Sequence, residues 1–496
     1  MFARAFRNSV RPVAFAARST RNVGTASRVL RQAQPLNSGS INWENPVKDA
    51  EFFVSGQNGF LPRQDPLEKL PEQYKELEEL MNEMPLTANN GKGLLALGKF
   101  GEQVDARLPL YDLTGVTDQR LLAALFRDYT FLASAYLLEP CDIQYLKTGS
   151  YGLGRQTLPK NIAVPLEVVA EKIGAKPFME YALSYALYNY KRIDKSKPAK
   201  YDNLKLIRGF SMCPNEHGFI LVHVDMVSNS GRLVTAANDT LAAVRKDDRG
   251  LFDVSLENYF QGLLTINKAM DTMWKRSDPG KYNSFRTFIM GTKNQPMFPN
   301  GVIYEGSPNK EPRFYRGESG ANDSMVPLSD NLFELTSQMP DNPLSKVLKD
   351  FRSYRPVNHH SFLSHVETEA RNVGVQKYAM KNAFSAAVLL KNLDQIRDFR
   401  HRHWTFTKEY IIKNTTHPTA TGGSPIVTWL PNQLTSVLNA IYNVSGSIDM
   451  SKLDLETQDI VDAIRRRGVS QLRVLEREVS DFQQQKEYAD QSKYAN

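Results

Sequence analysis

The chain is poor in cysteine and contains no long apolar run. Its 496 residues include two cysteines, Cys141 and Cys213, which do not form a CxxC pair. This excludes a disulfide framework and a zinc knuckle, and it fits a compartment that keeps thiols reduced. The longest apolar runs, such as 386–390, are far shorter than the roughly 18 residues of a membrane-spanning helix. We therefore predict no transmembrane segment.

Acidic residues and lysine are absent from the first 43 positions. This stretch contains 7 arginines and is rich in Ser and Ala, with apolar residues in between. Such a composition is typical of a mitochondrial transit peptide, and a disordered basic tail is the alternative. We expect a mitochondrial location, with the cytoplasm as the alternative.

The remaining chain carries little net charge. The formal charge is +8, and subtracting the 7 arginines leaves about +1 for the other residues. Phosphate binding needs clustered Lys and Arg, so we expect no nucleic-acid partner.

Helical periodicity dominates the sequence, and strand-like alternation and internal repeats are rare. We predict helices over 91–107, 117–138 and 176–191, with turn residues from Pro140 onwards ending the second. The fold class is all-α. The charged stretch before residue 205 indicates a boundary between two helical domains. The predicted layout is a disordered targeting segment over 1–43, a small domain over 44–205, a large domain over 206–450 and a helical tail over 451–496.

The run from Asp394 to Ile412 has neither Gly nor Pro and can form one uninterrupted helix. Ile396, Phe399, Phe406 and Tyr410 form an apolar stripe, and His403 lies in the middle of it, whereas His401 faces outward. Arginines, including Arg397 and Arg400, fall on the flanks of this stripe. A histidine in such a stripe is either a core residue satisfied by a hydrogen bond or an axial ligand of haem iron. Periodicity alone does not choose between them.

Two further stretches place polar groups beside aromatic ones. In a helix that begins at Gly218, Phe219 and His223 share one face, either as amphipathic core or as a pocket wall with one polar group. Tyr282, Arg286 and Ile289 likewise share a face. An arginine in this setting is either a surface residue or a buried clamp for a carboxylate.

Two loops are rich in glycine. Arg316–Ser324 reads RGESGANDS, and Gly422 and Gly423 follow the central helix. Glycine allows close backbone approach, and the amides and hydroxyls could donate to an anion, although a solvated turn fits equally well.

Seven stretches occur in the order of a known family. They are LPKNIAVPLEVV (158–169), GFILVH, FRTFIMG, GVIYEG, RGESGANDS, FRHRH and ATGGS. Together they resemble the indoleamine 2,3-dioxygenase family over roughly residues 55 to 440, and the sequence is similar to fungal members. Each motif is weak by itself, whereas their collinear order is specific.

The resemblance implies a two-domain all-α fold with a haem b pocket mainly in the larger C-terminal domain. It implies cleavage of the indole C2–C3 bond of L-tryptophan by O₂, which gives N-formylkynurenine on the kynurenine pathway. The alternative is a haem-binding protein with weak or no tryptophan turnover, in a redox or gas-sensing role. We expect a monomer.

The resemblance also implies roles for single residues. His403 takes the place of the axial iron ligand, Ser319 and Gly320 lie over the haem edge, and Arg400 approaches a propionate. Arg286 takes a catalytic position and grips the substrate carboxylate. His223 is expected to be catalytic too, although the best-known animal members carry Ser at this position; a histidine could hydrogen-bond the indole N–H or O₂. The other residues expected to bind substrate are Tyr181, Ser184, Phe219, Tyr282, Ile289 and Thr421, the last on a loop that closes over the pocket.

Lys281 departs from the family pattern. The position five before Arg286 usually carries Phe in active members, and here it carries lysine. Loss of an aromatic contact costs about 0.5–1.5 kcal/mol beyond area burial. A charge in the pocket would weaken binding further, so we expect weak tryptophan binding or an altered substrate.

Overall fold

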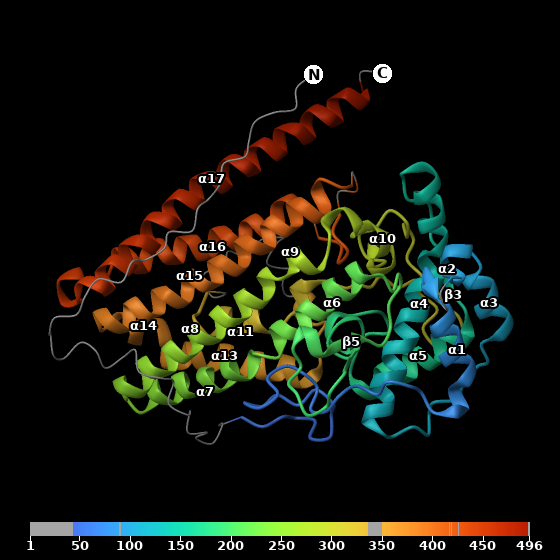
Figure 1. Cartoon of the computed structure of the whole chain (residues 1–496), viewed down its shortest axis with the longest axis horizontal. Coiled ribbons are helices and arrows are strands. Elements are labelled where there is room, and N and C mark those ends of the chain that lie inside the picture. The colour runs from blue at the N-terminus through green and yellow to red at the C-terminus, as the bar shows by residue number, and fades with distance from the viewer. Residues whose placement is uncertain are drawn as a thin grey trace. The chain divides into compact units, whose positions relative to one another are not determined.

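Helices make up most of the chain, and the strands are few and short (Figure 1). The structure is a computed structural model that describes residues 43–88, 91–335, 350–415, 417, 419–424 and 426–494. The all-α prediction is confirmed. The predicted targeting segment, apart from residue 43, lies outside the described residues.

The elements up to residue 206 include one long helix and several short ones. Their helices are η1 (Glu72–Tyr74), α1 (Lys75–Glu83), α2 (Leu94–Leu97), α3 (Phe100–Arg107), α4 (Gln119–Thr148), α5 (Lys160–Ile173), η2 (Tyr181–Tyr185) and η3 (Tyr201–Asn203). Two-residue strands β1 (Thr87–Ala88) and β2 (Gly91–Lys92) pair antiparallel, as do β4 (Tyr190–Arg192) and β5 (Leu204–Leu206). β3 (Thr157–Leu158) pairs in parallel with β6 (Ile303–Tyr304).

The later elements are mostly long helices. They are α6 (Pro214–Val227), α7 (Ser230–Arg245), α8 (Arg249–Asp271), α9 (Met273–Arg276), α10 (Asn283–Arg286), α11 (Met325–Leu332), α13 (Val357–Val373), α14 (Val375–Met380), α15 (Ala383–Phe406), α16 (Ile426–Gly446) and α17 (Leu455–Tyr494). Single turns are η4 (Pro279–Lys281), η5 (Thr287–Ile289), η6 (Gly320–Asn322), η8 (Thr407–Ile412) and η9 (Met450–Lys452). α15 packs against α8, α16 and α17 (Figure 1).

The predicted end of the helix before Pro140 is wrong, because α4 runs on to Thr148. A proline inside a helix leaves carbonyl groups of the preceding turn without their usual donors. Here the carbonyls of Tyr136 and Leu137 accept hydrogen bonds from the side chain and the backbone of Arg155. A residue outside the helix therefore satisfies the groups that Pro140 leaves open.

Two other predicted helices are also interrupted. The 91–107 helix breaks at Gly98, which has a left-handed φ of 65°, and α3 restarts where Glu139 accepts from its first two amides. In place of the predicted helix over 176–191 there is the π-helical turn η2, followed by β4. The side-chain amide of Asn189 donates to the carbonyl of Arg208 and accepts from its backbone N–H. These two hydrogen bonds hold β4 beside β5.

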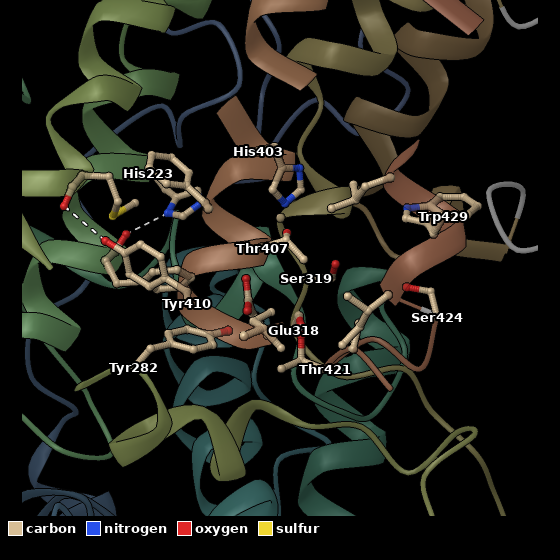
Figure 2. Close-up of a pocket in the computed structure, with 18 of the residues that line it drawn as sticks. His223, Tyr282, Glu318, Ser319, His403, Thr407, Tyr410, Thr421, Ser424 and Trp429 are labelled. Carbon is tan, nitrogen blue, oxygen red and sulfur yellow. Dashed lines mark hydrogen bonds between the residues drawn. The ribbon is translucent and has the colours of Figure 1, made fainter. Parts of the chain in front are cut away.

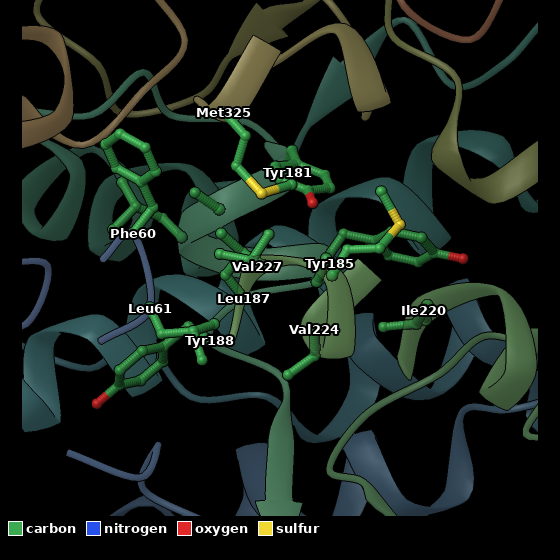
Figure 3. Packing of buried hydrophobic residues seen from close by; sticks show 14 of the residues in the cluster. Phe60, Leu61, Tyr181, Tyr185, Leu187, Tyr188, Ile220, Val224, Val227 and Met325 are labelled. Atoms are coloured by element: carbon green, nitrogen blue, oxygen red, sulfur yellow. The ribbon is translucent and has the colours of Figure 1, made fainter. Parts of the chain in front are cut away.

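The hydrophobic core is continuous across the predicted boundary near residue 205. Figure 3 shows Tyr181, Tyr185 and Tyr188 packed in one cluster with Val224 and Val227 of α6. The division into two domains stays a prediction.

α4 forms the centre of the earlier elements. In the described part of the chain it alone is long and apolar enough to cross a membrane, and 94% of its apolar stretch is buried inside the fold. It carries a buried ion network in which Asp128 accepts from Arg127 at 2.7 Å and from Arg208 at 2.9 Å. Burial alone would raise the pKa of Asp128, but the two guanidinium charges outweigh it and lower the pKa to about 2.

We expect Asp128→Asn to lower the free energy of unfolding by about 3–5 kcal/mol, because it leaves the buried Arg127 without a counter-charge and Arg208 with Glu78 alone. Urea denaturation followed by circular dichroism measures this. The control is Glu83→Gln, which removes a surface partner of Arg107 and should change stability by less than about 1 kcal/mol. Equal effects of the two substitutions would contradict the prediction.

Candidate active site

α15 directs the imidazole of His403 into a pocket (Figure 2). Within the described residues the ring has no hydrogen-bond partner. Desolvation, assisted by the nearby His223, lowers the pKa of His403 to about 4. The imidazole is therefore neutral at physiological pH and can offer a nitrogen lone pair to a metal.

Polar contacts to neighbouring helices set the rotation of α15. The buried indole of Trp404 donates to Glu478 of α17 at 2.8 Å, and Arg402 donates to Asp271 of α8 at 3.0 Å. Ile396, Phe406 and Tyr410 are buried as predicted. The helix runs without interruption into the π-helical turn η8.

The two arginines on the flanks of the stripe point into the fold. Arg397 and Arg400 are buried, because each has an acidic partner inside the fold. Arg397 donates to Asp394 at 2.6 Å. Arg400 donates to both oxygens of Asp330 at 2.8 Å and does not line the pocket. Its predicted approach to a propionate therefore has no support from its position.

The pocket is largely apolar and has a cavity volume of about 130 Å³. Its polar groups are few, as is usual for a small-molecule site. The apolar wall is formed by Phe219, Met226, Met270, Met273, Phe406, Ile411, Ala420, Ile426, Trp429 and Leu430. The remaining lining residues are His223, Tyr282, Glu318, Ser319, Gly320, His403, Thr407, Tyr410, Thr421 and Ser424.

His223 presents an acceptor to this space. Its Nδ1 lies 2.8 Å from the carbonyl oxygen of Phe219. A carbonyl only accepts, so Nδ1 carries the proton and Nε2 of the neutral ring has a free lone pair. Desolvation keeps the pKa of His223 below its usual value. The Nε2 atom lies near Gly320, at 3.8 Å from where a Cβ on that glycine would stand.

The two glycine-rich loops meet at the pocket and are bonded to each other. The hydroxyl of Thr421 donates to the carbonyl of Glu318 at 2.7 Å, and Arg316 donates to the carbonyl of Gly422 at 2.7 Å. The predicted close approach of glycine backbone is found at Gly317 and Gly291. A Cβ on Gly317 would stand 2.2 Å from the amide nitrogen of Gly291, which leaves no room for a side chain.

The structure brings together seven of the predicted site residues on the pocket wall. They are Phe219, His223, Tyr282, Ser319, Gly320, His403 and Thr421. Phe219 and Tyr282 form an aromatic pair with ring centroids 5.2 Å apart. The parts that these residues play in binding or catalysis stay predictions.

Five predicted residues do not line the pocket. Arg400 is described above. Tyr181 lies behind His223, with ring centroids 5.7 Å apart, and Ile289 is buried. The hydroxyl of Ser184 is engaged with the backbone of Glu180. Arg286 is fully buried and donates from Nη2 to the carbonyl of Thr419 at 2.9 Å, while its Nε and Nη1 atoms have no partner among the described residues.

Lys281 is exposed and does not line the pocket. The charge that we expected there is therefore absent from the wall, because the lysine lies at the end of η4 while the adjacent Tyr282 turns inward. The loss of the aromatic side chain at position 281, and weaker tryptophan binding as its consequence, stay predictions.

Sequence reasoning missed Glu318 and the methionines of the pocket. Glu318 belongs to the predicted glycine-rich loop, but nothing in its sequence context indicates that its carboxyl group is buried without a cation. Met226, Met270 and Met273 come from three helices, and an apolar residue at helical spacing is typical of any core.

The residues present fit a haem. A haem needs an apolar wall and an axial ligand on a rigid element, and the lining of the pocket and His403 on α15 are of this kind. Among the described residues no three His, Cys, Asp or Glu side chains gather to hold a metal ion by themselves. A helical fold with an imidazole on a long helix facing an apolar pocket is typical of helical haem proteins, and His403, whose ring has no hydrogen-bond partner among the described residues, is the residue that would hold the iron.

Comparison with known proteins identifies the family. A family model described as Indoleamine 2,3-dioxygenase matches residues 48–437. An indoleamine 2,3-dioxygenase of Aspergillus nanangensis is 26% identical over 431 residues, covering 80% of this chain and 98% of that protein. Indoleamine 2,3-dioxygenase 1 of Rattus norvegicus is 27% identical over 322 residues, covering 64% and 74%. A 6-hydroxytryptophan 2,3-dioxygenase of Fusarium equiseti is 24% identical over 320 residues, covering 64% and 73%.

The chain therefore belongs to the indoleamine 2,3-dioxygenase family, as the collinear motifs predict. It is an oxidoreductase of the haem dioxygenase type, and the family acts with O₂ on tryptophan-like indoles.

We expect His403→Ala to abolish the Soret absorption of the reconstituted protein, because the pocket loses its one free imidazole on α15. The matched control is His401→Ala, two residues away on the same helix and outside the pocket wall. Haem titration followed by absorption spectroscopy measures both. Tight haem binding by His403→Ala, with the spectrum of the wild type, would contradict the assignment.

Proposed function

We propose that the protein cleaves the indole C2–C3 bond of L-tryptophan with O₂ and releases N-formyl-L-kynurenine. One observation supports this most directly. In a chain of this family, the neutral imidazole of His403 shares an apolar pocket with the free Nε2 acceptor of His223. When bound, haem b supplies the iron that activates O₂.

His223 would orient the indole ring. Its Nε2 atom can accept a hydrogen bond from the indole N–H, which turns the C2–C3 bond to a fixed direction in the pocket. Phe219 and Tyr282 would pack against the ring faces. Their contribution is proximity and orientation rather than proton transfer.

Arg286 would bind the substrate carboxylate. A fully buried guanidinium with two unpartnered nitrogen atoms carries a desolvation cost that an anion offsets. Its third nitrogen donates to Thr419, at the start of the loop that contains Thr421. A carboxylate on Arg286 would thus be linked to closure of this loop, which excludes water from the pocket.

Formation of N-formylkynurenine from L-tryptophan by the reduced, haem-loaded protein tests this proposal. 6-Hydroxytryptophan is the comparison substrate, because one relative is named for it. Turnover of L-tryptophan supports the proposal. A normal haem spectrum without turnover of either indole would favour the alternative, a haem-binding protein with a redox or gas-sensing role.

We expect His223→Leu to raise the Kd for L-tryptophan about tenfold, because the indole N–H loses its hydrogen-bond acceptor in a largely apolar pocket. The Kd for 1-methyl-L-tryptophan, whose indole nitrogen carries a methyl group in place of the hydrogen, should stay unchanged. Calorimetric titration of the haem-loaded protein without O₂ measures both. An equal loss for the two ligands would indicate that His223 only shapes the pocket.

We further propose that the arginine-rich residues 1–43 direct the protein to mitochondria, on the basis of their composition. A fluorescent protein fused to these residues should enter mitochondria. The control fusion carries glutamine at all 7 arginine positions and should stay in the cytoplasm. Cytoplasmic location of both fusions would overturn the proposal.

A further inference from the structure

One acidic group faces the pocket without a partner. Glu318 lies on the 316–324 loop and lines the pocket beside Tyr282 (Figure 2). The residue is 3% exposed. In the described part of the chain its carboxyl group accepts no hydrogen bond and forms no ion pair.

No basic side chain among the described residues pairs with this carboxyl group. The described residues on the pocket wall include no lysine and no arginine. Arg316, two residues before Glu318, pairs with Asp350 at 2.7 Å and donates to Gly422. Arg286 donates to Thr419 and does not line the pocket. An uncompensated carboxyl group in an apolar wall is costly, and such groups concentrate at binding sites.

The backbone holds this carboxyl group in a fixed place. The amide of Glu318 donates to the carbonyl of Ile289 at 3.1 Å, and its own carbonyl accepts from the hydroxyl of Thr421. The preceding Gly317 crosses Gly291 at contact distance. These contacts hold the backbone of the loop at Glu318, which keeps the side chain at the pocket wall.

Burial also sets the protonation of Glu318. Desolvation raises its pKa to about 8. The other titratable groups that face this space are His223, His403, Tyr282 and Tyr410, and none is a cation at neutral pH. An ammonium group brought by a ligand would favour the ionised carboxylate.

We propose that Glu318 is a specificity-determining residue that binds the ammonium group of the substrate. The pocket would then select indoles with an alkylammonium chain over indoles that carry only a carboxylate. This inference rests on the proposed function, because it assumes that an indole occupies the pocket. It predicts that the ammonium group of the substrate contributes more to affinity than the carboxylate does, because the described pocket wall carries an acidic residue and no basic one.

Three ligands separate the two ends of the substrate. L-Tryptophan carries both charged groups, tryptamine only the ammonium, and indole-3-propionate only the carboxylate. Calorimetric titration of the haem-loaded protein without O₂ gives a Kd for each. We expect Glu318→Gln to raise the Kd for L-tryptophan and for tryptamine about tenfold or more, because each ligand loses a charged hydrogen bond. Indole-3-propionate should bind unchanged or more tightly.

Two further variants control for structural effects. Glu318→Asp keeps the charge and should restore part of the affinity for tryptamine. Glu311→Gln makes the same change at an exposed position and should leave all three Kd values unchanged. Thermal unfolding of Glu318→Gln should match the wild type or exceed it, because the substitution removes a buried, unpaired acid.

The outcomes also separate this inference from the proposed function. Equal weakening of all three ligands, no weakening of any, or a wild type that binds neither amine would overturn the role of Glu318. Failure of the dioxygenase proposal has a different signature, which is absence of N-formylkynurenine from the wild type. The ligand pattern of Glu318→Gln can be read in either case.

Discussion

The unpartnered imidazole of His403 is the constraint on which the site depends. A polar ring held without a hydrogen bond in an apolar wall is costly unless it binds a ligand. The ring keeps its direction because other sides of α15 are tied down. Trp404 bonds Glu478 and Arg397 bonds Gln471, both on α17. The helix therefore holds the imidazole of His403 rigidly, with a ring nitrogen free to bind iron as an axial ligand.

The rest of the pocket comes from segments that are distant in sequence. α6 contributes His223 and Phe219, and the loops 316–324 and 419–424 contribute most of the other polar groups. The hydroxyl of Thr421 joins the second loop to the carbonyl of Glu318 on the first. The amide of Gly291, outside both loops, donates to the carbonyl of Thr421.

Two buried residues that can carry opposite charges stand out, because neither has an ionic partner among the described residues. Arg286 has two free nitrogen atoms, and Glu318 has a free carboxyl group. They do not pair with each other, although their charges are opposite. An amino acid carries a carboxylate and an ammonium group, so that these two residues offer one counter-charge for each of its ends. Under our proposals, the ligand completes an electrostatic arrangement that the protein leaves open.

The sequence by itself determined the helical class, the family, and the helix and loops that carry the site. Periodicity placed Ile396, Phe406 and Tyr410 in the core and His403 among them, because helical spacing is a local property of the chain. It could not show that α4 continues through Pro140, since the donor that permits this is Arg155, outside the helix. Nor could it show that Arg400 is paired with Asp330, that Lys281 is exposed, or that Glu318 is left without a cation. Only the tertiary structure decided these points, because burial and charge pairing depend on which distant segments meet.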